Sequence, residues 1–233
     1  MATPLARQAP PGPDLPLYRM DVGTYHRIAR SGALEGLDVE LRDGLLVERG
    51  GEHAGTIHLL DTNTYNRMVT TGALDDEPLE LLEGLLVEMS PQGAGHAVVI
   101  WRLTRHLAAA RVWLGVQLPL ELKPGSEPEP DLTLVECEPS PQRHPDRALL
   151  AVEVAVTSHR KDRDRKGVLY ARAGVRTYWL VDVPGRAVEV RTEPGPGGYG
   201  RCEVYRVGAV IPSPAEGVPN LDVAWLFEDA AAG

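Results

Sequence analysis

The sequence has few cysteines, few aromatic residues and no long apolar run. Its two cysteines, Cys137 and Cys202, are too few for a disulfide framework or a cysteine zinc site. Aromatic residues make up 5% of the 233 residues, so we expect an aliphatic core. No stretch approaches the roughly 20 apolar residues of a membrane-spanning helix. Residues 1–15 are rich in proline and lack the apolar segment of a secretory signal. We therefore expect a flexible tail on a cytoplasmic protein that has no membrane partner.

An internal repeat organises the N-terminal part of the chain. Residues 21–48 recur as residues 61–88, with 14 of 28 positions identical. Each copy begins with an aspartate suited to capping a helix and contains an Asp-Gly or Glu-Gly pair suited to a hairpin turn. Two copies are too few for a solenoid. We predict a duplicated helix–hairpin unit. The first copy (16–58) would be peripheral, and the second would supply a hairpin to the main sheet of a domain spanning residues 59–229.

Beyond the repeat, the pattern changes to helices and short strands. Val99, Leu103 and Leu107 recur at four-residue steps, which predicts one apolar helix face between about Ala94 and Trp113. Several short apolar runs follow, separated by one basic helical stretch. The order helix, hairpin, helix, strands, helix, strands predicts an α/β fold, with a mixed central sheet flanked by helices.

Three charged residues of this region predict a reactive site. The run Leu149–Val156 is apolar except for Glu153, which indicates a strand covered on both faces. A carboxylate in such a strand is costly unless it is paired, neutralised or bound to a metal. Asp131 follows a proline at the head of another apolar strand, and Lys166 lies in the basic helical stretch. Two acids from neighbouring strands and a lysine predict a divalent-metal phosphodiesterase site.

Positive charge gathers immediately after the Glu153 strand. The chain carries a net charge of −9, but residues 159–176 contain seven Lys/Arg and two Asp, a local balance of +5 that leaves −14 for the remainder. Such a run is either a solvated helix face or a surface that binds a polyanion such as DNA. In the second case the phosphate contacts would come from Arg160, Lys161, Arg163 and Arg165.

The chemistry of phosphodiester hydrolysis assigns a role to each candidate. A hard divalent cation held by carboxylates activates water and neutralises the charge of the transition state. Asp131 and Glu153 are candidate ligands for Mg²⁺ or Mn²⁺, and Glu88 is a further acidic candidate. Lys166 would orient or activate the attacking water, and His96 is either a catalytic residue or a core histidine. Structural alternatives are a solvent-facing Glu88, a strand-capping Asp131, and a Glu153 paired with Lys166 or an arginine without metal.

From about Leu60 to Phe227 the chain resembles the putative restriction endonuclease family of the PD-(D/E)XK nuclease superfamily. The matching segments are LELLEGLLVEMSP, the helix beginning at His96, EPDLTLV, LLAVEVAVTS, KDRDRKGVLYARAGVRTYWLVD with Asp162 and Lys166, and VGAVIPSPAEGVPNLDVAWLF. The superfamily pattern usually has a lysine two residues after the strand glutamate, where this chain has Ala155. The resemblance implies that Lys166, on the following helix, takes that role.

The resemblance implies a restriction-endonuclease-like fold and metal-dependent cleavage of DNA. One alternative is a catalytically silent relative that binds nucleic acid or another protein. A scaffold without a nucleic-acid role is a third reading, and the basic helix counts against it. Retention of Asp131, Glu153 and Lys166 favours the enzyme, because a silent module has no need of a buried acid. A homodimer, with the first repeat copy at the contact, is a further candidate assembly.

Overall fold

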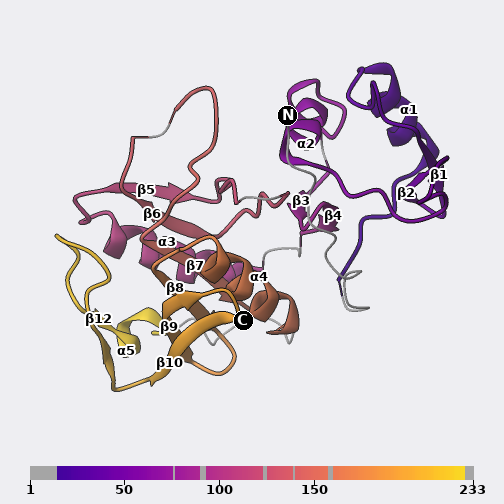
Figure 1. Cartoon of the computed structure of the whole chain (residues 1–233). Helices are drawn as coiled ribbons and strands as arrows, with labels where there is room; N and C mark the ends of the chain where they lie inside the picture. Colours follow the sequence, from indigo (N-terminus) through magenta and orange to yellow (C-terminus); the bar gives the residue numbers. More distant parts are fainter. Residues whose placement is uncertain are drawn as a thin grey trace. The chain divides into compact units, whose positions relative to one another are not determined.

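The computed structural model describes residues 15–75, 77–89, 93–122, 125–138, 140–156 and 160–228, without the side chains of residues 160–163. The chain divides into two compact units (Figure 1). The N-terminal unit holds residues 1–90 and 123–127, and the C-terminal unit holds the remainder. The sequence had suggested a boundary between residues 58 and 59 instead. Within the described part of the chain, no helix is both long and apolar enough to cross a membrane.

Two helix–hairpin segments of equal length form the N-terminal unit. Their elements are α1 (Val22–Arg30), β1 (Val39–Arg42), β2 (Leu45–Glu48), α2 (Thr62–Thr70), β3 (Leu79–Leu82) and β4 (Leu85–Glu88). Asp21 and Asp61 cap the two helices by accepting a hydrogen bond from the backbone N–H three residues later. Asp43 and Glu83 both have a φ of 50° and precede a glycine of positive φ, as a two-residue hairpin turn requires. Both helices and both turns therefore lie where the repeat predicts them.

Each hairpin is extended by a segment that precedes one of the helices. The segment before α1 pairs with β4 through a Leu17–Val87 bridge, and the segment before α2 pairs with β2 through an Ile57–Val47 bridge. Two pairs of backbone hydrogen bonds accompany these bridges, namely Tyr18 N to Leu86 O with His58 N to Leu46 O, and Glu88 N to Pro16 O with Glu48 N to Thr56 O. The start of the first copy thus pairs with the hairpin of the second, which joins the two copies in one unit.

A shared core explains why the unit ends near residue 90. Ile28 of the first copy and Met68 of the second belong to one aliphatic cluster. The hairpin β3–β4 forms a two-stranded sheet of its own. Leu17 borders β4, and Glu127 bonds to Leu81 on the edge of β3. Both edges of this hairpin are thus already paired within the unit. The expectation that the second copy joins the main sheet is therefore wrong.

The C-terminal unit is built on a six-stranded mixed sheet in the order β10-β9-β8-β7-β6-β5 (Figure 1). Its helices and strands are α3 (Ala94–Leu107), β5 (Trp113–Val116), β6 (Leu132–Val135), β7 (Leu150–Ala155), α4 (Arg160–Arg172), β8 (Thr177–Asp182), β9 (Ala187–Gly195), β10 (Gly198–Arg206), β11 (Val210–Ile211), β12 (Leu221–Asp222) and α5 (Val223–Leu226). Strands β7 and β8 are parallel, joined by α4, and the other neighbours are antiparallel. The predicted mixed sheet flanked by helices is confirmed.

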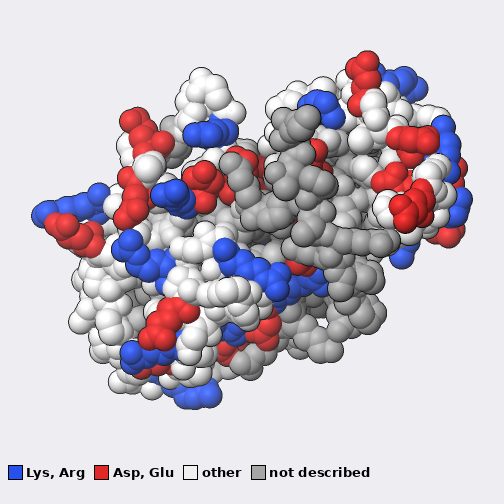
Figure 2. All heavy atoms as spheres, viewed as in Figure 1, with Lys and Arg blue, Asp and Glu red and all other residues white. Residues whose placement is uncertain are grey.

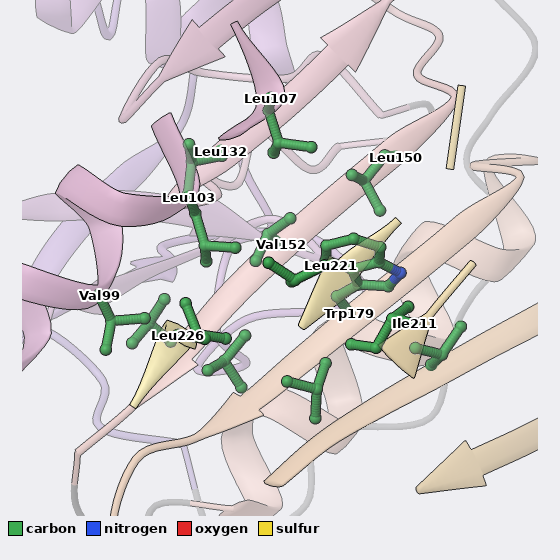
Figure 3. Packing of buried hydrophobic residues seen from close by; sticks show 14 of the residues in the cluster. Val99, Leu103, Leu107, Leu132, Leu150, Val152, Trp179, Ile211, Leu221 and Leu226 are labelled. Carbon is green, nitrogen blue, oxygen red and sulfur yellow. The ribbon is translucent and has the colours of Figure 1, made fainter. Parts of the chain in front are cut away.

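One face of this sheet carries the main hydrophobic core (Figure 3). Val99 and Leu103 of α3 pack there with alternate residues of the strands, including Val152 and Trp179. The intervening residues of the strands face α4 on the other side, because successive side chains of a strand point to opposite faces. Glu153 belongs to that second face.

The helix α3 is shorter than its sequence pattern predicts. It ends at Leu107, and Trp113 begins the edge strand β5. Residues Trp113–Val116 pair with Val135–Leu132 across an antiparallel ladder. Leu114 continues the helical spacing in the sequence, but the backbone hydrogen bonds gained at the sheet edge outweigh that local preference.

Candidate active site

Asp131 and Glu153 lie on neighbouring segments of the central sheet. Leu132 at the start of β6 pairs with Val152 of β7. Asp131 directly precedes β6, and its carboxylate accepts the backbone N–H of Val154, the residue after Glu153. Both residues are buried, at 8% and 5% exposure. The structure therefore brings the Asp131 carboxylate, predicted from a separate apolar run of the sequence, to the backbone of the Glu153 strand.

Asp131 connects helix α3 to the backbone of β7. One carboxylate oxygen accepts the backbone N–H of Val154 at 2.7 Å, and the other lies 3.1 Å from Nε2 of His96. His96 is buried, and its Nδ1 has no hydrogen-bond partner within the described part of the chain. His96, which the sequence predicted as a candidate site residue, therefore contacts Asp131.

Glu153 receives two partners from helix α4. Its Oε1 lies 3.2 Å from Nζ of Lys166 and accepts a hydrogen bond of 2.7 Å from the hydroxyl of Tyr170. The two donors are four residues apart, so they project from the same side of the helix. The Lys166 and Glu153 side chains are 12% and 7% exposed. A buried carboxylate in an apolar strand is stabilised by such a cation and hydroxyl.

The sequence analysis did not single out Tyr170. The sequence pattern that could have identified it is its spacing of four residues from Lys166, because residues four apart lie on the same face of a helix. The centroid of its ring lies 5.3 Å from that of Tyr178 in β8. The Tyr178 ring in turn stacks on that of Tyr199 in β10, with 6.1 Å between the centroids. Tyr170 therefore holds Glu153 from a position that aromatic packing fixes.

The donor set suits a small, hard cation. Among the described residues, no three His, Cys, Asp or Glu side chains are grouped as a ready-made metal cage. Mg²⁺ does not need such a cage, because it keeps several waters and is commonly bound through one or two carboxylates. Asp131 and Glu153 supply two buried carboxylates. Tyr170 donates a hydrogen bond to Glu153, and Nε2 of His96 lies 3.1 Å from Asp131. The residues present therefore fit a magnesium or manganese ion.

Glu88, the third predicted metal ligand, belongs to the N-terminal unit. It is the exposed last residue of β4, and its backbone N–H bonds to Pro16. Its place beside the other two acids remains a prediction. The same unit contains two buried acids that the sequence analysis missed, Glu80 at 4% and Glu127 at 2% exposure. Glu80 interrupts the apolar strand LELL, which is the signal that singled out Glu153.

Helix α4 carries the predicted phosphate-binding residues. Arg165 is described and is partly exposed, whereas the side chains of Arg160, Lys161 and Arg163 lie outside the described part of the structure. Figure 2 shows Lys and Arg side chains over the part of the C-terminal unit where Figure 1 places α4. Positive charge therefore lies on the element that supplies Lys166 to Glu153.

Comparison with known proteins agrees with this geometry. A family model described as putative restriction endonuclease matches residues 62–225. A crystal structure of a putative nuclease from Anabaena variabilis has a similar fold, with a TM-score of 0.53 and 16% sequence identity over 64% of this chain and 90% of that one. No curated protein matches the chain. The family match spans well over half of the chain and includes Asp131, Glu153 and Lys166, so this chain belongs to the putative restriction endonuclease family.

Proposed function

We propose that this protein is a metal-dependent endonuclease that hydrolyses phosphodiester bonds in DNA. Membership of its family supports a nuclease. The finer proposal is supported by two buried acids on neighbouring segments of the sheet, Asp131 and Glu153, with Lys166 beside Glu153 at 3.2 Å. The two carboxylates would bind the ion and the lysine would supply positive charge, which are the two requirements for attack of water on a phosphodiester.

Asp131 and Glu153 would hold the ion, Mg²⁺ or Mn²⁺. A divalent ion bound there supplies Lewis acidity and neutralises charge on the phosphate. Tyr170 would orient Glu153 by its hydrogen bond of 2.7 Å, and His96, with Nε2 at 3.1 Å from Asp131, would orient the other carboxylate. Such outer partners commonly decide how well a metal site binds, because they fix the direction of the ligand oxygens.

Lys166 would act on the attacking water or on the negative charge that develops at phosphorus. Its Nζ already lies at the carboxylate, so a small rotation of its side chain would redirect the ammonium group from Glu153 to a substrate oxygen. Lysine is suited to this role because its ammonium group is a compact charge on a flexible stem with three rotatable donors. Its interaction with substrate would be strongest in the transition state.

The basic residues of α4 would bring DNA to an otherwise acidic protein. Two carboxylates repel a phosphodiester, and the chain as a whole carries −9. Arg160, Lys161, Arg163 and Arg165 supply four positive charges directly before Lys166. We propose that they contact phosphates on either side of the scissile bond, which would offset this repulsion and position the strand.

The test is cleavage of supercoiled plasmid and of linear and single-stranded DNA with Mg²⁺ or Mn²⁺. The wild-type protein should nick or cut DNA, and EDTA should abolish cleavage. Asp131→Asn and Glu153→Gln should each be inactive while remaining folded. Glu203→Gln is the matched control, because Glu203 is an exposed acid of β10 in the same sheet. Binding of DNA without metal-dependent cleavage of any form would contradict the proposal and favour the silent relative.

A further inference from the structure

A second buried acid lies on the α4 face of the sheet, in the same row as Glu153. Glu153 of β7 pairs with Leu180 of β8, and Leu180 pairs with Glu189 of β9. The two acids are therefore two strands apart, about 10 Å at ordinary strand spacing. Glu189 is 7% exposed, so it too requires a partner.

Arg191 provides that partner and reaches helix α4 as well. Its Nη2 lies 2.7 Å from Oε2 of Glu189, and the same nitrogen contacts Oδ1 of Asp164 in α4. The guanidinium lies over the ring of Tyr178, 5.7 Å from its centroid. Burial alone would lower the pKa of Arg191, but the bonds with Glu189 and Asp164 outweigh burial and raise it. Arg191 is therefore a permanent cation that joins strand β9 to the helix.

The helix lies close to the sheet beside this contact. A side-chain carbon at Gly167 would lie 3.0 Å from the ring of Tyr178 and 3.2 Å from the guanidinium of Arg191. A larger residue there would force the Tyr178 ring, the Arg191 side chain or the helix to shift. Gly167 directly follows Lys166. The anchoring contact and the close approach therefore flank the lysine that pairs with Glu153.

We propose that Arg191 is a positioning residue for the reaction. By holding Asp164, it fixes the helix segment from which Lys166 and Tyr170 reach Glu153. This proposal rests on the proposed nuclease function. A helix is rigid over one turn, so loss of the Asp164 contact would shift Lys166 together with its neighbours. A misplacement of about 1 Å at a reacting group can cost about a hundredfold in rate.

The neighbouring strand contains a matched control. Arg201 and Glu203 of β10 form an Arg–Glu pair with the same two-residue spacing, at 2.6 Å. Their side chains are 59% and 44% exposed, whereas the Arg191 side chain is 17% exposed. Arg201→Met thus removes a comparable ion pair from the same sheet without removing the contact with Asp164.

The experiment compares Arg191→Met, Arg191→Lys and Arg201→Met with the wild-type protein. Single-turnover cleavage of DNA should slow by about 10- to 100-fold in Arg191→Met, with KM for DNA within about twofold. Arg191→Lys should recover part of the rate, since it keeps a cation but loses the planar fork. Arg201→Met should cleave at the wild-type rate. Amide hydrogen exchange in residues 164–172 should accelerate only when Arg191 is changed.

Failure of this proposal and failure of the proposed function give different results. A wild-type enzyme that cleaves, together with an Arg191→Met variant that cleaves equally fast, overturns the positioning role alone. A wild-type protein without cleavage overturns both, and unchanged exchange in α4 would also reject the anchor. If Arg191→Met does not fold, Asp164→Asn tests the same contact from the 47% exposed helix side. It should slow cleavage in the same direction by a smaller factor.

Discussion

The tetrapeptide Ala-Val-Glu-Val occurs twice in the central sheet, in β7 at residues 151–154 and in β9 at residues 187–190. The two glutamates lie in one row on one face of the sheet, and both are buried. Their partners differ. Glu153 meets a lysine and a tyrosine from α4, whereas Glu189 meets an arginine two residues later on its own strand.

This difference separates a reactive acid from a structural one. Arg191 is a permanent cation with a planar fork, and it fixes Glu189 as a charged structural group. Lys166 is a compact cation on a flexible stem that can turn from the carboxylate to a substrate. The cross-strand neighbours differ as well. Asp131 lies on the segment beside the Glu153 strand, whereas Glu189 pairs with Leu180 and Val204. Glu189 also has a second carboxylate nearby, that of Asp164, but Nη2 of Arg191 contacts both and already supplies their cation.

The largest expected effect separates the two acids by activity. Glu153→Gln should reduce cleavage at least about a thousandfold, because the amide cannot neutralise a divalent ion. It retains an oxygen that can accept the Tyr170 hydrogen bond, so the fold should persist. Glu189→Gln should reduce cleavage less than about tenfold, acting only through Arg191. Single-turnover rates with Mn²⁺ measure both variants, and equal losses would erase the distinction between the two acids.

A smaller effect should separate the two cations. Lys166→Met should slow the chemical step by about a hundredfold at nearly unchanged affinity for DNA, because its contact with substrate is made mainly in the transition state. Lys166→Arg should not restore the rate, since the guanidinium is bulkier and differently directed. Cleavage rates and fluorescence-anisotropy binding test this together. If Lys166→Met cleaved at the wild-type rate, the lysine would have no catalytic role and would serve only as a counter-ion for Glu153.

The effects on stability should have the opposite order, with the larger loss in Glu189→Gln. Glu189→Gln removes the charge opposite a buried arginine and should lower the free energy of unfolding by about 1–3 kcal/mol. Glu153→Gln should change it less, because the substitution also removes the repulsion between the Asp131 and Glu153 carboxylates. Urea unfolding followed by circular dichroism measures both. A greater loss of stability in Glu153→Gln would mark Glu153 as the structural member of the pair.

The smallest expected effect concerns pH, because the stability that Arg191 contributes should not change across the neutral range. Arg191 has a raised pKa in the folded protein, so its contribution to stability is present at neutral and moderately alkaline pH and is lost only in strongly alkaline solution, as the pH rises through the folded pKa. The difference in unfolding free energy between wild type and Arg191→Met should therefore be flat between about pH 6 and pH 10. A steep slope in that window would show that another group titrates with the pair.

The sequence revealed the acids of the site more readily than their partners. Asp131 and Glu153 were predictable, because each is a charge in an otherwise apolar run that must form a buried strand. Nothing in either Ala-Val-Glu-Val segment tells which glutamate is reactive. That depends on the side chains that α4 presents to each acid, and on the pairing of β6 with β7 that brings Asp131 to the Glu153 strand.

The division of the chain was harder to predict, for a related reason. The repeat predicted both helices and both turns of the N-terminal unit, because caps and hairpin turns are local. It did not show that the start of the first copy would pair with the hairpin of the second. The Leu17–Val87 and Ile57–Val47 bridges join residues that local patterns do not relate. The shortened α3 has the same origin, since Trp113–Val116 gains its partners from β6.

We propose that Asp131 and Glu153 together bind a divalent ion. Titration of the full chain with Mn²⁺, followed by electron paramagnetic resonance of the free ion, tests this without DNA and without catalysis. We predict saturable binding to wild type and to Glu189→Gln, weakened at least tenfold in Asp131→Asn and Glu153→Gln. Equal binding by all four proteins, or none by the wild type, would contradict the account.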